Sequence, residues 1–492
     1  MTSSEGKSIS RRKYLELTGG VVAGLAVGGA LGYLAKPPEM VTQTVTATET
    51  VTVTGTAPPV TTVAPATTLT EEQLIKYGFS AFEKATKPLA EPQDWISPPA
   101  EYKGKKEIVI GASMPLTGIF SWAASWQKLK DQWLADINKK GGLLGLPVRS
   151  IVYDDASDAA RAISNYTKLI TLDKVDLLWS GCPTPTMIPV MSAIDNYGYN
   201  VLMSGSSDYE GFLLANNGKQ WNGGFEIQIE AEFFNYGVWP WLASLPDNVR
   251  PKKVGIIYGN YSPFTVHGYK GAKYFAEQLG MNVVYEKDYP SDVTDYTPLV
   301  NGAKQAGVEV LMSPDTALDP AKLILEAMRT LNYQPSVFWT IEVLYPGFED
   351  SKKPGFLQPL TYYTTGTALQ WDTWPDPPFK DTKYWTEVYK KLFGISYANF
   401  DSAWAPFECQ IIEQAVQASG SLDQQVLRRY LMEHSFNTLF GRIDFHDNKI
   451  LRGLTVGTSQ VDGNGALQII NPDSLKTATG TFPRPDWSTY YK

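Results

Sequence analysis

The chain has 492 residues, of which 43% are hydrophobic and 19% are charged, a composition that is ordinary for soluble proteins with buried cores. Its net charge is −8 and its Lys and Arg residues form no cluster, so nucleic acid is not expected as a partner. The length predicts roughly three units of about 150 residues, fewer once the non-globular N-terminal hundred residues are set aside.

The first 36 residues resemble an export signal. Two arginines in SRRKYL (10–15) precede a glycine-rich apolar stretch that ends near Ala35, which is typical of the twin-arginine route. The two cysteines, Cys182 and Cys409, lie far behind this stretch, so lipid anchoring through an N-terminal cysteine is not expected. No convincing cleavage motif is present, which leaves residues 1–36 as a signal or an uncleaved membrane anchor. The alternative is a chance basic pair before a buried helix. The sequence therefore predicts an extracytoplasmic protein tethered to the cell membrane through residues 1–36.

Residues 37–70 predict a stalk between this anchor and the globular part. The run 41–68 consists mainly of Thr, Val, Ala and Pro, with almost no charge and no large side chain to pack. Residues 71–106 are predicted to be a connecting segment.

From Glu107 onward, apolar strand patterns alternate with amphipathic helix patterns. In the first half, strands are expected within 106–116, 148–155, 175–183 and 199–207, and helices within 125–142, 156–174 and 184–198. The rhythm restarts with strands within 252–263, 281–290, 308–320 and 335–344, and helices within 267–280, 294–307 and 321–334. A long helix follows at 403–420. This alternation predicts an α/β protein with doubly wound parallel sheets.

Two such lobes, joined by a multi-strand hinge, follow from the repeated pattern. Lobe one is predicted to comprise 107–224 and 363–453, lobe two 225–362 and 454–475, and 476–492 a C-terminal tail. In sheets of this kind, ligands bind at the carboxyl ends of the strands. Cys182 and Cys409 are not expected to pair, because spacing alone cannot bring them within bonding range.

Catalytic and metal-binding patterns are missing. Three scattered histidines give no metal-ligand spacing, and the chain has no nucleophile elbow, phosphate loop or dinucleotide fingerprint, so no cofactor, no metal and no enzyme activity are expected. Asp154 and Asp155 are neighbours in a βα loop, where an acid and base pair is less favoured than a helix-capping or loop-structuring role.

Binding groups are better supplied. Loop hydroxyls near helix starts can hold an anionic or carbonyl group, and they are Thr184, Thr186, Ser204, Ser206 and Ser207. Trp122, Trp404 and Phe264 can form walls of a cleft, with ordinary core packing as the alternative for each tryptophan. Glu342 follows a buried strand at its carboxyl end, where it would need a cation or hydrogen-bond donor unless it is a solvated loop charge.

The order of these pieces resembles one family. PLTG after the first strand, a helix ending in INKKGGLLG, the strand VRSIVYDDASD, then VDLLWSGCPTPT and the late stretch FNTLFGRIDFHDNKILRG are similar to the leucine/isoleucine/valine-type binding proteins of ABC importers. The resemblance covers about residues 107–470. It implies the type I periplasmic-binding-protein fold, a small-molecule solute between two lobes, and partnership with an ABC permease and ATP-binding subunits.

The resemblance also implies roles for individual residues. The ligand carboxylate would be held by the loops that carry Thr184 and Ser206 to Ser207, and the ligand ammonium by Glu342. Thr316 and Phe264 would contribute from neighbouring lobe-two loops. Trp122 falls on or beside the aromatic that follows PLTG, and Trp404 matches the helix that closes the pocket.

Two classes of function remain at this point. The first is a solute receptor, for a branched-chain or related amino acid or, alternatively, an amide, urea-like or cationic solute. The second is an exported enzyme, a sensor or a surface protein on the same scaffold, since fold does not fix function. The missing catalytic constellation disfavours an enzyme.

Overall fold

The computed structural model describes residues 82–204, 221–315, 317–341, 357–360, 381–394, 403–454, 457–462, 467–473 and 475–486. All of them belong to one compact unit, residues 63–492. The predicted export signal and stalk lie outside the described residues. Within the described part of the chain, no helix has the length and apolarity that a membrane crossing requires.

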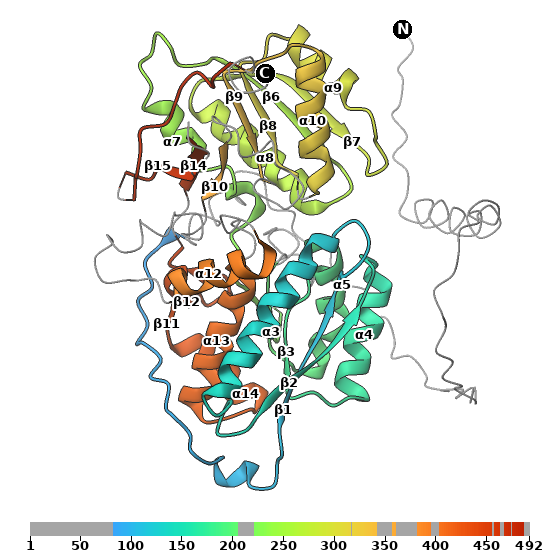
Figure 1. Ribbon diagram of the computed structural model, residues 1–492, viewed down its shortest axis with the longest axis vertical. Helices are drawn as coiled ribbons and strands as arrows, with labels where there is room; N and C mark the ends of the chain where they lie inside the picture. The colour runs from blue at the N-terminus through green and yellow to red at the C-terminus, as the bar shows by residue number, and fades with distance from the viewer. Residues whose placement is uncertain are drawn as a thin grey trace, which may run out of the picture. The chain divides into compact units, whose positions relative to one another are not determined.

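Lobe one is built on a parallel sheet with the strand order β2-β1-β3 (Figure 1). Its first elements are, in chain order, β1 (Ile108–Met114), η3 (Ser121–Ala123), α3 (Ala124–Lys139), β2 (Val148–Asp154), α4 (Ala159–Thr171), β3 (Leu177–Leu178), α5 (Thr184–Ile194), η4 (Asp195–Tyr197), β4 (Val201–Met203) and β5 (Gly224–Glu226). They confirm the predicted alternation. One prediction needs correction, because β4 pairs with β5 in a separate two-stranded sheet rather than extending the first sheet.

The later part of the chain completes lobe one. Its elements are α12 (Thr382–Phe393), α13 (Trp404–Ser419), α14 (Gln424–Glu433), β11 (Phe436–Thr438), β12 (Gly441–Phe445) and β13 (Leu451–Arg452). The long α13 is buried along most of its length and packs against α3. Cys182 and Cys409 are both buried and are not joined to each other by a disulfide.

Lobe two contains, among the described residues, a seven-stranded sheet of order β15-β14-β10-β9-β8-β6-β7. Its elements are η5 (Ala231–Phe233), α7 (Val238–Ala243), β6 (Lys253–Gly259), α8 (Pro263–Gln278), β7 (Asn282–Tyr289), α9 (Thr297–Gln305), β8 (Val310–Ser313), α10 (Leu318–Thr330), β9 (Val337–Thr340), β10 (Leu357–Leu360), β14 (Gly457–Val461) and β15 (Leu467–Asn471). The strands β6 to β9 pair in parallel, as predicted. β10, which was not predicted, also pairs in parallel with β9. β14 and β15 join in antiparallel order, which the alternation did not reveal.

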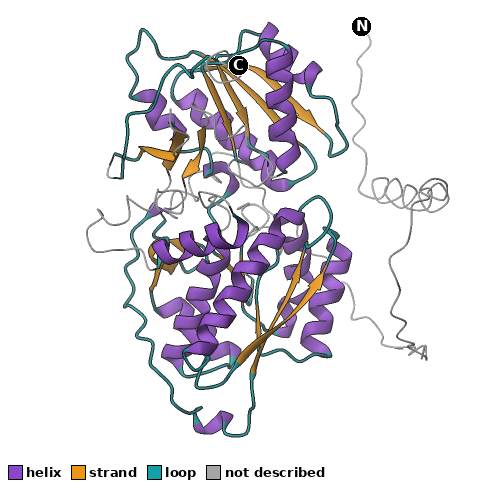
Figure 2. Cartoon of the chain, viewed as in Figure 1, coloured by secondary structure: helices purple, strands orange, loops and turns teal. Residues whose placement is uncertain are grey.

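Helices cover both faces of the lobe-two sheet (Figure 2). Alternate residues of a strand point to opposite faces, and in β8 this places Met312 in the core beneath α8 and Leu311 in the core beneath α9 and α10. In β9, likewise, Trp339 lies in the core beneath α8 and Phe338 in the core beneath α9 and α10. Strands buried on both sides explain the continuous apolar runs of the sequence.

Residues 82–106, predicted only as a connecting segment, form an ordered N-terminal strap on lobe one. In Figure 1 the strap is the blue trace that passes β11 and α13 and reaches η2 (Ala100–Tyr102) before β1 begins. Trp95 donates a 2.9 Å hydrogen bond to the Gln417 carbonyl and lies against Gly420, where an added Cβ would stand 2.9 Å from its ring. At the start of the strap, Phe82 packs edge-on against Phe233 of lobe two, with ring centroids 5.2 Å apart.

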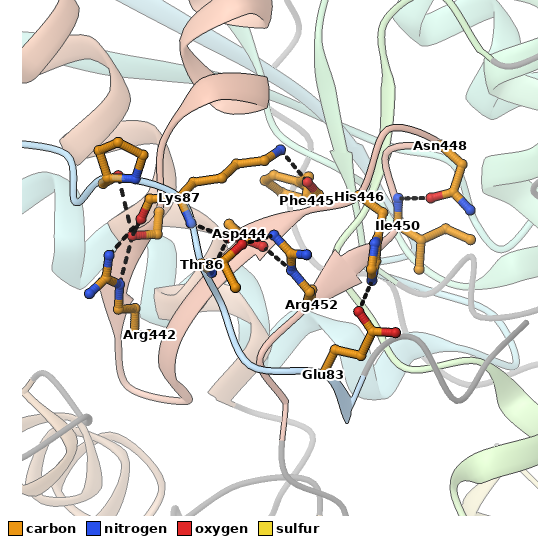
Figure 3. Close-up of polar contacts among 12 residues, drawn as sticks. Glu83, Thr86, Lys87, Arg442, Asp444, Phe445, His446, Asn448, Ile450 and Arg452 are labelled. Atoms are coloured by element: carbon orange, nitrogen blue, oxygen red, sulfur yellow. Dashed lines mark hydrogen bonds and ion pairs between the residues drawn. The ribbon is translucent and has the colours of Figure 1, made fainter.

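A polar cluster fixes the strap to the β12–β13 hairpin (Figure 3). The buried carboxylate of Asp444 accepts hydrogen bonds from the backbone amides of Thr86 and Lys87, at 2.7 and 2.9 Å. The same carboxylate pairs with Arg452, at 2.6 Å to Nε and 2.9 Å to Nη2. One acidic side chain therefore joins segments that lie more than 350 positions apart in the sequence.

The C-terminal tail contacts lobe two. Gln460 of β14 exchanges two hydrogen bonds with the backbone of Thr481, and the Arg484 amide donates to the Ser336 carbonyl at 2.8 Å. The described part of the tail is thus held by backbone contacts.

Candidate functional site

A pocket of about 590 Å³ is lined by loops from both lobes. Its described lining residues are Gly118, Ile119, Ser121, Trp122, Ser125, Tyr261, Ser291, Asp292, Val293, Thr294, Tyr296, Ala317, Asp319, Pro320, Leu323, Tyr389 and Phe393. The loops follow β1, β6, β7 and β8, so the pocket lies at the carboxyl ends of parallel strands, where the sequence places the ligand. Its volume is within the range of small-molecule sites.

The lobe-one wall of the pocket is shaped by the double aspartate. Asp154 accepts hydrogen bonds from the amides of Leu116 and Thr117, at 3.0 and 3.2 Å, and from the Thr117 hydroxyl at 2.7 Å. Burial alone would raise the pKa of Asp154, but these hydrogen bonds outweigh it and lower that pKa. The loop that leads to Trp122 is therefore held by a charged acceptor.

Asp155 has a different environment from its neighbour. It is buried, accepts hydrogen bonds from the Ser113 hydroxyl and the Ser157 amide, and burial raises its pKa to about 6. Asp158 caps α4 by accepting from the Arg161 amide at 2.7 Å. The loop-structuring role predicted for Asp154 and Asp155 is confirmed, and the helix cap is made by Asp158 instead.

The lobe-two wall is organised by a second buried carboxylate. Asp315 accepts 2.5 Å hydrogen bonds from the hydroxyls of Tyr261 and Tyr289, and one of 2.8 Å from the Ala317 amide. The Tyr296 ring packs edge-on against Tyr289, with centroids 4.9 Å apart. Burial raises the pKa of Asp315, and the hydroxyl donors oppose that rise. This carboxylate fixes Tyr261 in the pocket wall.

A buried ion pair fixes the loop before α5. Lys130 of α3 lies 2.7 Å from Glu408 of α13, and both side chains are fully buried. Lys130 Nζ also donates to the Ser180 carbonyl at 3.0 Å, and the Ser180 amide donates to Glu408 at 2.6 Å. The Ser180 hydroxyl accepts from the Ser204 amide at 3.1 Å and so joins the ends of β3 and β4.

Among the ten predicted ligand-binding residues, Trp122 lines the pocket, half-buried and edge-on to Trp126. Thr184 and Thr186 lie buried in the first turn of α5, and Ser204 is buried at the end of β4. The Thr186 hydroxyl donates to the Pro183 carbonyl at 2.8 Å, which is a local capping interaction. These three residues gather near the carboxyl edge of lobe one and do not line the pocket itself.

Two predicted wall residues belong to the core. Phe264 is 4% exposed and packs edge-on against Phe234, with centroids 4.9 Å apart. Trp404 is fully buried and packs against Phe440 at 4.7 Å. For Trp404 this is the core-packing alternative that the sequence left open. The remaining predictions, Ser206, Ser207, Thr316 and Glu342, lie outside the described residues.

Sequence reasoning missed most of the aromatic lining. Tyr261 lies in a loop that follows a predicted strand, so its position was available, but nothing singled it out. Tyr389 and Phe393 come from α12, a helix that was not predicted. No group of three or more His, Cys, Asp or Glu side chains within the described part of the chain is arranged to hold a metal ion.

Comparisons with known proteins agree on one family and one fold. A protein-family model described as periplasmic binding protein matches residues 107–464. Among solved structures, a leucine-, isoleucine-, valine-, threonine- and alanine-binding protein from Brucella ovis is similar at 15% identity, with a TM-score of 0.60, over 77% of this chain and 94% of that one.

Two further structures carry bound ligands. The branched-chain amino acid transporter substrate-binding protein LivJ from Streptococcus pneumoniae, in complex with isoleucine, is 16% identical with a TM-score of 0.60, over 75% of this chain and 100% of that one. A solute-binding protein of an ABC transporter from Rhodopseudomonas palustris BisB5, in complex with 3,4-dihydroxy benzoic acid, is 14% identical with a TM-score of 0.60, over 78% and 99%. At such identities the likeness establishes the type I periplasmic-binding-protein fold alone.

Proposed function

The chain belongs to the periplasmic binding protein family, and on this premise we propose that it captures a small polar solute between its two lobes and delivers it to an ABC permease. It is a solute-binding protein and not an enzyme. Transport itself would require permease and ATP-binding subunits as separate chains. One observation carries the proposal: loops from the carboxyl edges of both lobes line one pocket of ligand size. A ligand that touches both lobes favours the closed form by its differential affinity.

A branched-chain or related amino acid is the ligand we propose first. Similar structures from two organisms are named for binding such amino acids. The loops of Thr184 and of Ser204 to Ser207 would hold the carboxylate, and Glu342 the ammonium group. Export by the twin-arginine route and tethering through residues 1–36 complete the proposal.

A ring-bearing ligand is the second candidate. Aromatic side chains form much of the described lining, and they are Trp122, Tyr261, Tyr296, Tyr389 and Phe393. A neighbour of the same fold binds 3,4-dihydroxy benzoic acid. An amide, a urea-like solute or an organic cation would use the same hydroxyl and carboxylate groups.

A thermal-shift screen of the full-length chain tests the proposal. The panel contains amino acids, amides, polyamines and aromatic acids, each at millimolar concentration. A ligand at about 100 times its dissociation constant stabilises the folded state by about 2.7 kcal/mol, which moves the midpoint visibly. Stabilisation by any one class supports a solute receptor and identifies its substrate. If no ligand of the panel raises the melting midpoint, a sensor or surface protein on the same fold is favoured.

Removing the charge of Glu342 tests the proposed ammonium contact. We expect Glu342→Gln to lower the affinity for the amino acid that binds by 10- to 100-fold, about 1.5–3 kcal/mol for a charge-assisted hydrogen bond. Titration calorimetry with wild type and variant measures the change. Unchanged affinity would remove this residue from the site.

A further inference from the structure

An acidic side chain not discussed so far, Glu230, lies in the segment that connects the two lobes. Residues 227–230 lead from β5 in lobe one to η5 in lobe two. The Ile227 amide donates to the Met203 carbonyl at 3.3 Å, so this crossover starts beside the end of β4 and next to Ser204. Glu230 thus follows the carboxyl edge of lobe one by a few residues.

The other end of the crossover reaches the carboxyl edge of lobe two. An added Cβ on Gly268 of α8 would lie 3.7 Å from the Ala231 carbonyl oxygen and 2.9 Å from Pro314, the residue after β8. The crossover therefore packs where β8 ends and α8 passes, one residue from Glu230. In this fold class, such a position between two sets of strand ends is where ligands bind.

Glu230 is fully buried, and neither carboxylate oxygen has a hydrogen-bond partner in another residue. Three other buried carboxylates on the described part of the chain have hydrogen-bond donors or a cation beside them. Asp315 has two tyrosine hydroxyls, Glu408 has Lys130, and Asp444 has Arg452. Burying a carboxyl group without hydrogen-bond donors lowers the stability of the fold, so a role outside stability is expected for it.

Hydroxyl groups at the same strand ends share this property. Several of the buried hydroxyl oxygens without a hydrogen-bond partner, within the described ranges, lie where strands end or the following helix begins, and they are Ser204 Oγ, Ser262 Oγ, Ser313 Oγ and Thr340 Oγ1. Others, such as Thr386 Oγ1 and Ser459 Oγ, lie elsewhere. Ser313 and Thr340 are register partners on β8 and β9. The carboxyl edges of both lobes therefore present polar atoms that the protein itself leaves unsatisfied, which is the chemistry of a site that awaits a polar ligand.

We propose that Glu230 is the countercharge for a cationic group, an ammonium or amidinium, of the bound solute. The inference rests on the proposed function and narrows its substrate class. Amino acids, amines and other organic cations fit, whereas aromatic acids without an ammonium group do not.

The charge state of Glu230 gives the proposal a distinctive signature. Burial, with the nearby charge of Glu232, raises the pKa of Glu230 well above its usual range. The other ionisable groups on the elements next to the crossover are Glu226 on β5, Glu232 on η5, and His267, Tyr269, Lys270, Lys273, Tyr274 and Glu277 on α8. His267 Nδ1 lies 2.5 Å from Glu232. Burial therefore favours the protonated form of Glu230 in the empty site. A bound cation favours the carboxylate, so binding releases that proton to the buffer and affinity rises with pH.

Titration calorimetry on the full-length chain tests the inference, with L-leucine, putrescine and sodium benzoate as probes. We expect leucine or putrescine to bind, and Glu230→Gln to weaken that binding at least tenfold while the empty protein keeps its thermal midpoint. Glu277→Gln, an exposed change on α8, is the matched control and should leave the affinity unaltered. Binding heats in phosphate and Tris buffers should differ for wild type, because a proton is released, and should agree for Glu230→Gln.

The outcomes distinguish failure of the inference from failure of the proposed function. Ammonium binding that persists within threefold in Glu230→Gln, or binding of benzoate alone, overturns the inference and leaves the proposed receptor intact. If no probe binds the wild-type chain, the proposed function and the inference fail together. Should Glu230→Gln fail to fold, the wild-type pH profile decides, since affinity for the ammonium probe must rise with pH if Glu230 is the countercharge.

Discussion

Replacing Lys130 by methionine is expected to lower the free energy of unfolding by about 3–5 kcal/mol, because it leaves the Glu408 carboxylate buried without its cation. The Ser180 carbonyl loses a donor in the same change, so the loop before α5 is loosened as well. Urea unfolding monitored by tryptophan fluorescence measures the loss. Ligand affinity should fall further than stability alone explains, since this loop adjoins the predicted binding residue Thr184.

Two further variants separate this effect from the removal of any lysine. Lys139→Met on the same helix breaks an exposed pair with Asp136 and should cost less than about 1 kcal/mol. The double variant Lys130→Met with Glu408→Leu should recover much of the lost stability, because apolar groups can replace a buried pair. A loss below about 1 kcal/mol for Lys130→Met would contradict a structural role for the pair.

Neutralising Asp444 should have the second largest effect. Asp444→Asn removes the charge that pairs with Arg452 and offers an amide where Thr86 and Lys87 need an acceptor. We expect a loss of about 3 kcal/mol in the free energy of unfolding. Limited proteolysis should then cleave the strap, which wild type protects. Asp447→Asn, an exposed change on the same hairpin, should alter neither quantity.

The same carboxylate predicts how the strap responds to acid. Partial burial raises the pKa of Asp444, but the hydrogen bond from Arg452 and the strap amides outweigh it and lower that pKa. A folded-state pKa below the unfolded value of about 4 means that the stabilisation is complete above pH 4 and disappears as pH falls through the folded pKa. Strap protection should therefore be lost on the acid side, and protection that increases as the pH falls would contradict the assignment.

The sequence was sufficient for the repeating units of the fold, because each strand and helix carries its pattern locally. β1, α3, β2 and α4 lie where the apolar periodicity places them, and Asp158 caps α4 as its residue type suggests. The pairing of strands is a different kind of information. Nothing in the pattern distinguishes β4 joining β3 from β4 joining β5, and nothing marks β14 as antiparallel.

The site was harder to predict than the fold. The sequence alone does not show whether a tryptophan lines a pocket or packs in a core. Trp122 lines the pocket, whereas Trp404 is buried in the core. Glu230 could not be predicted as a site residue from the sequence. Its lack of hydrogen-bond donors arises from the packing of α8 and the crossover, not from its neighbours in sequence. Likeness to a family points to positions that the family uses, such as Glu342, and is silent on features that belong to this chain.

The strap has a consequence for where this protein can be cut. Family similarity begins at Glu107, and a fragment starting there would retain both sheets with all their strands. It would still lack native structure, because Gly420 would lose the indole of Trp95 that covers it and Asp444 two of its donors. The smallest piece that keeps the described contacts of the strap with both lobes begins no later than Phe82. For this chain, the region shared with the family is therefore shorter than the folded domain by the length of the strap.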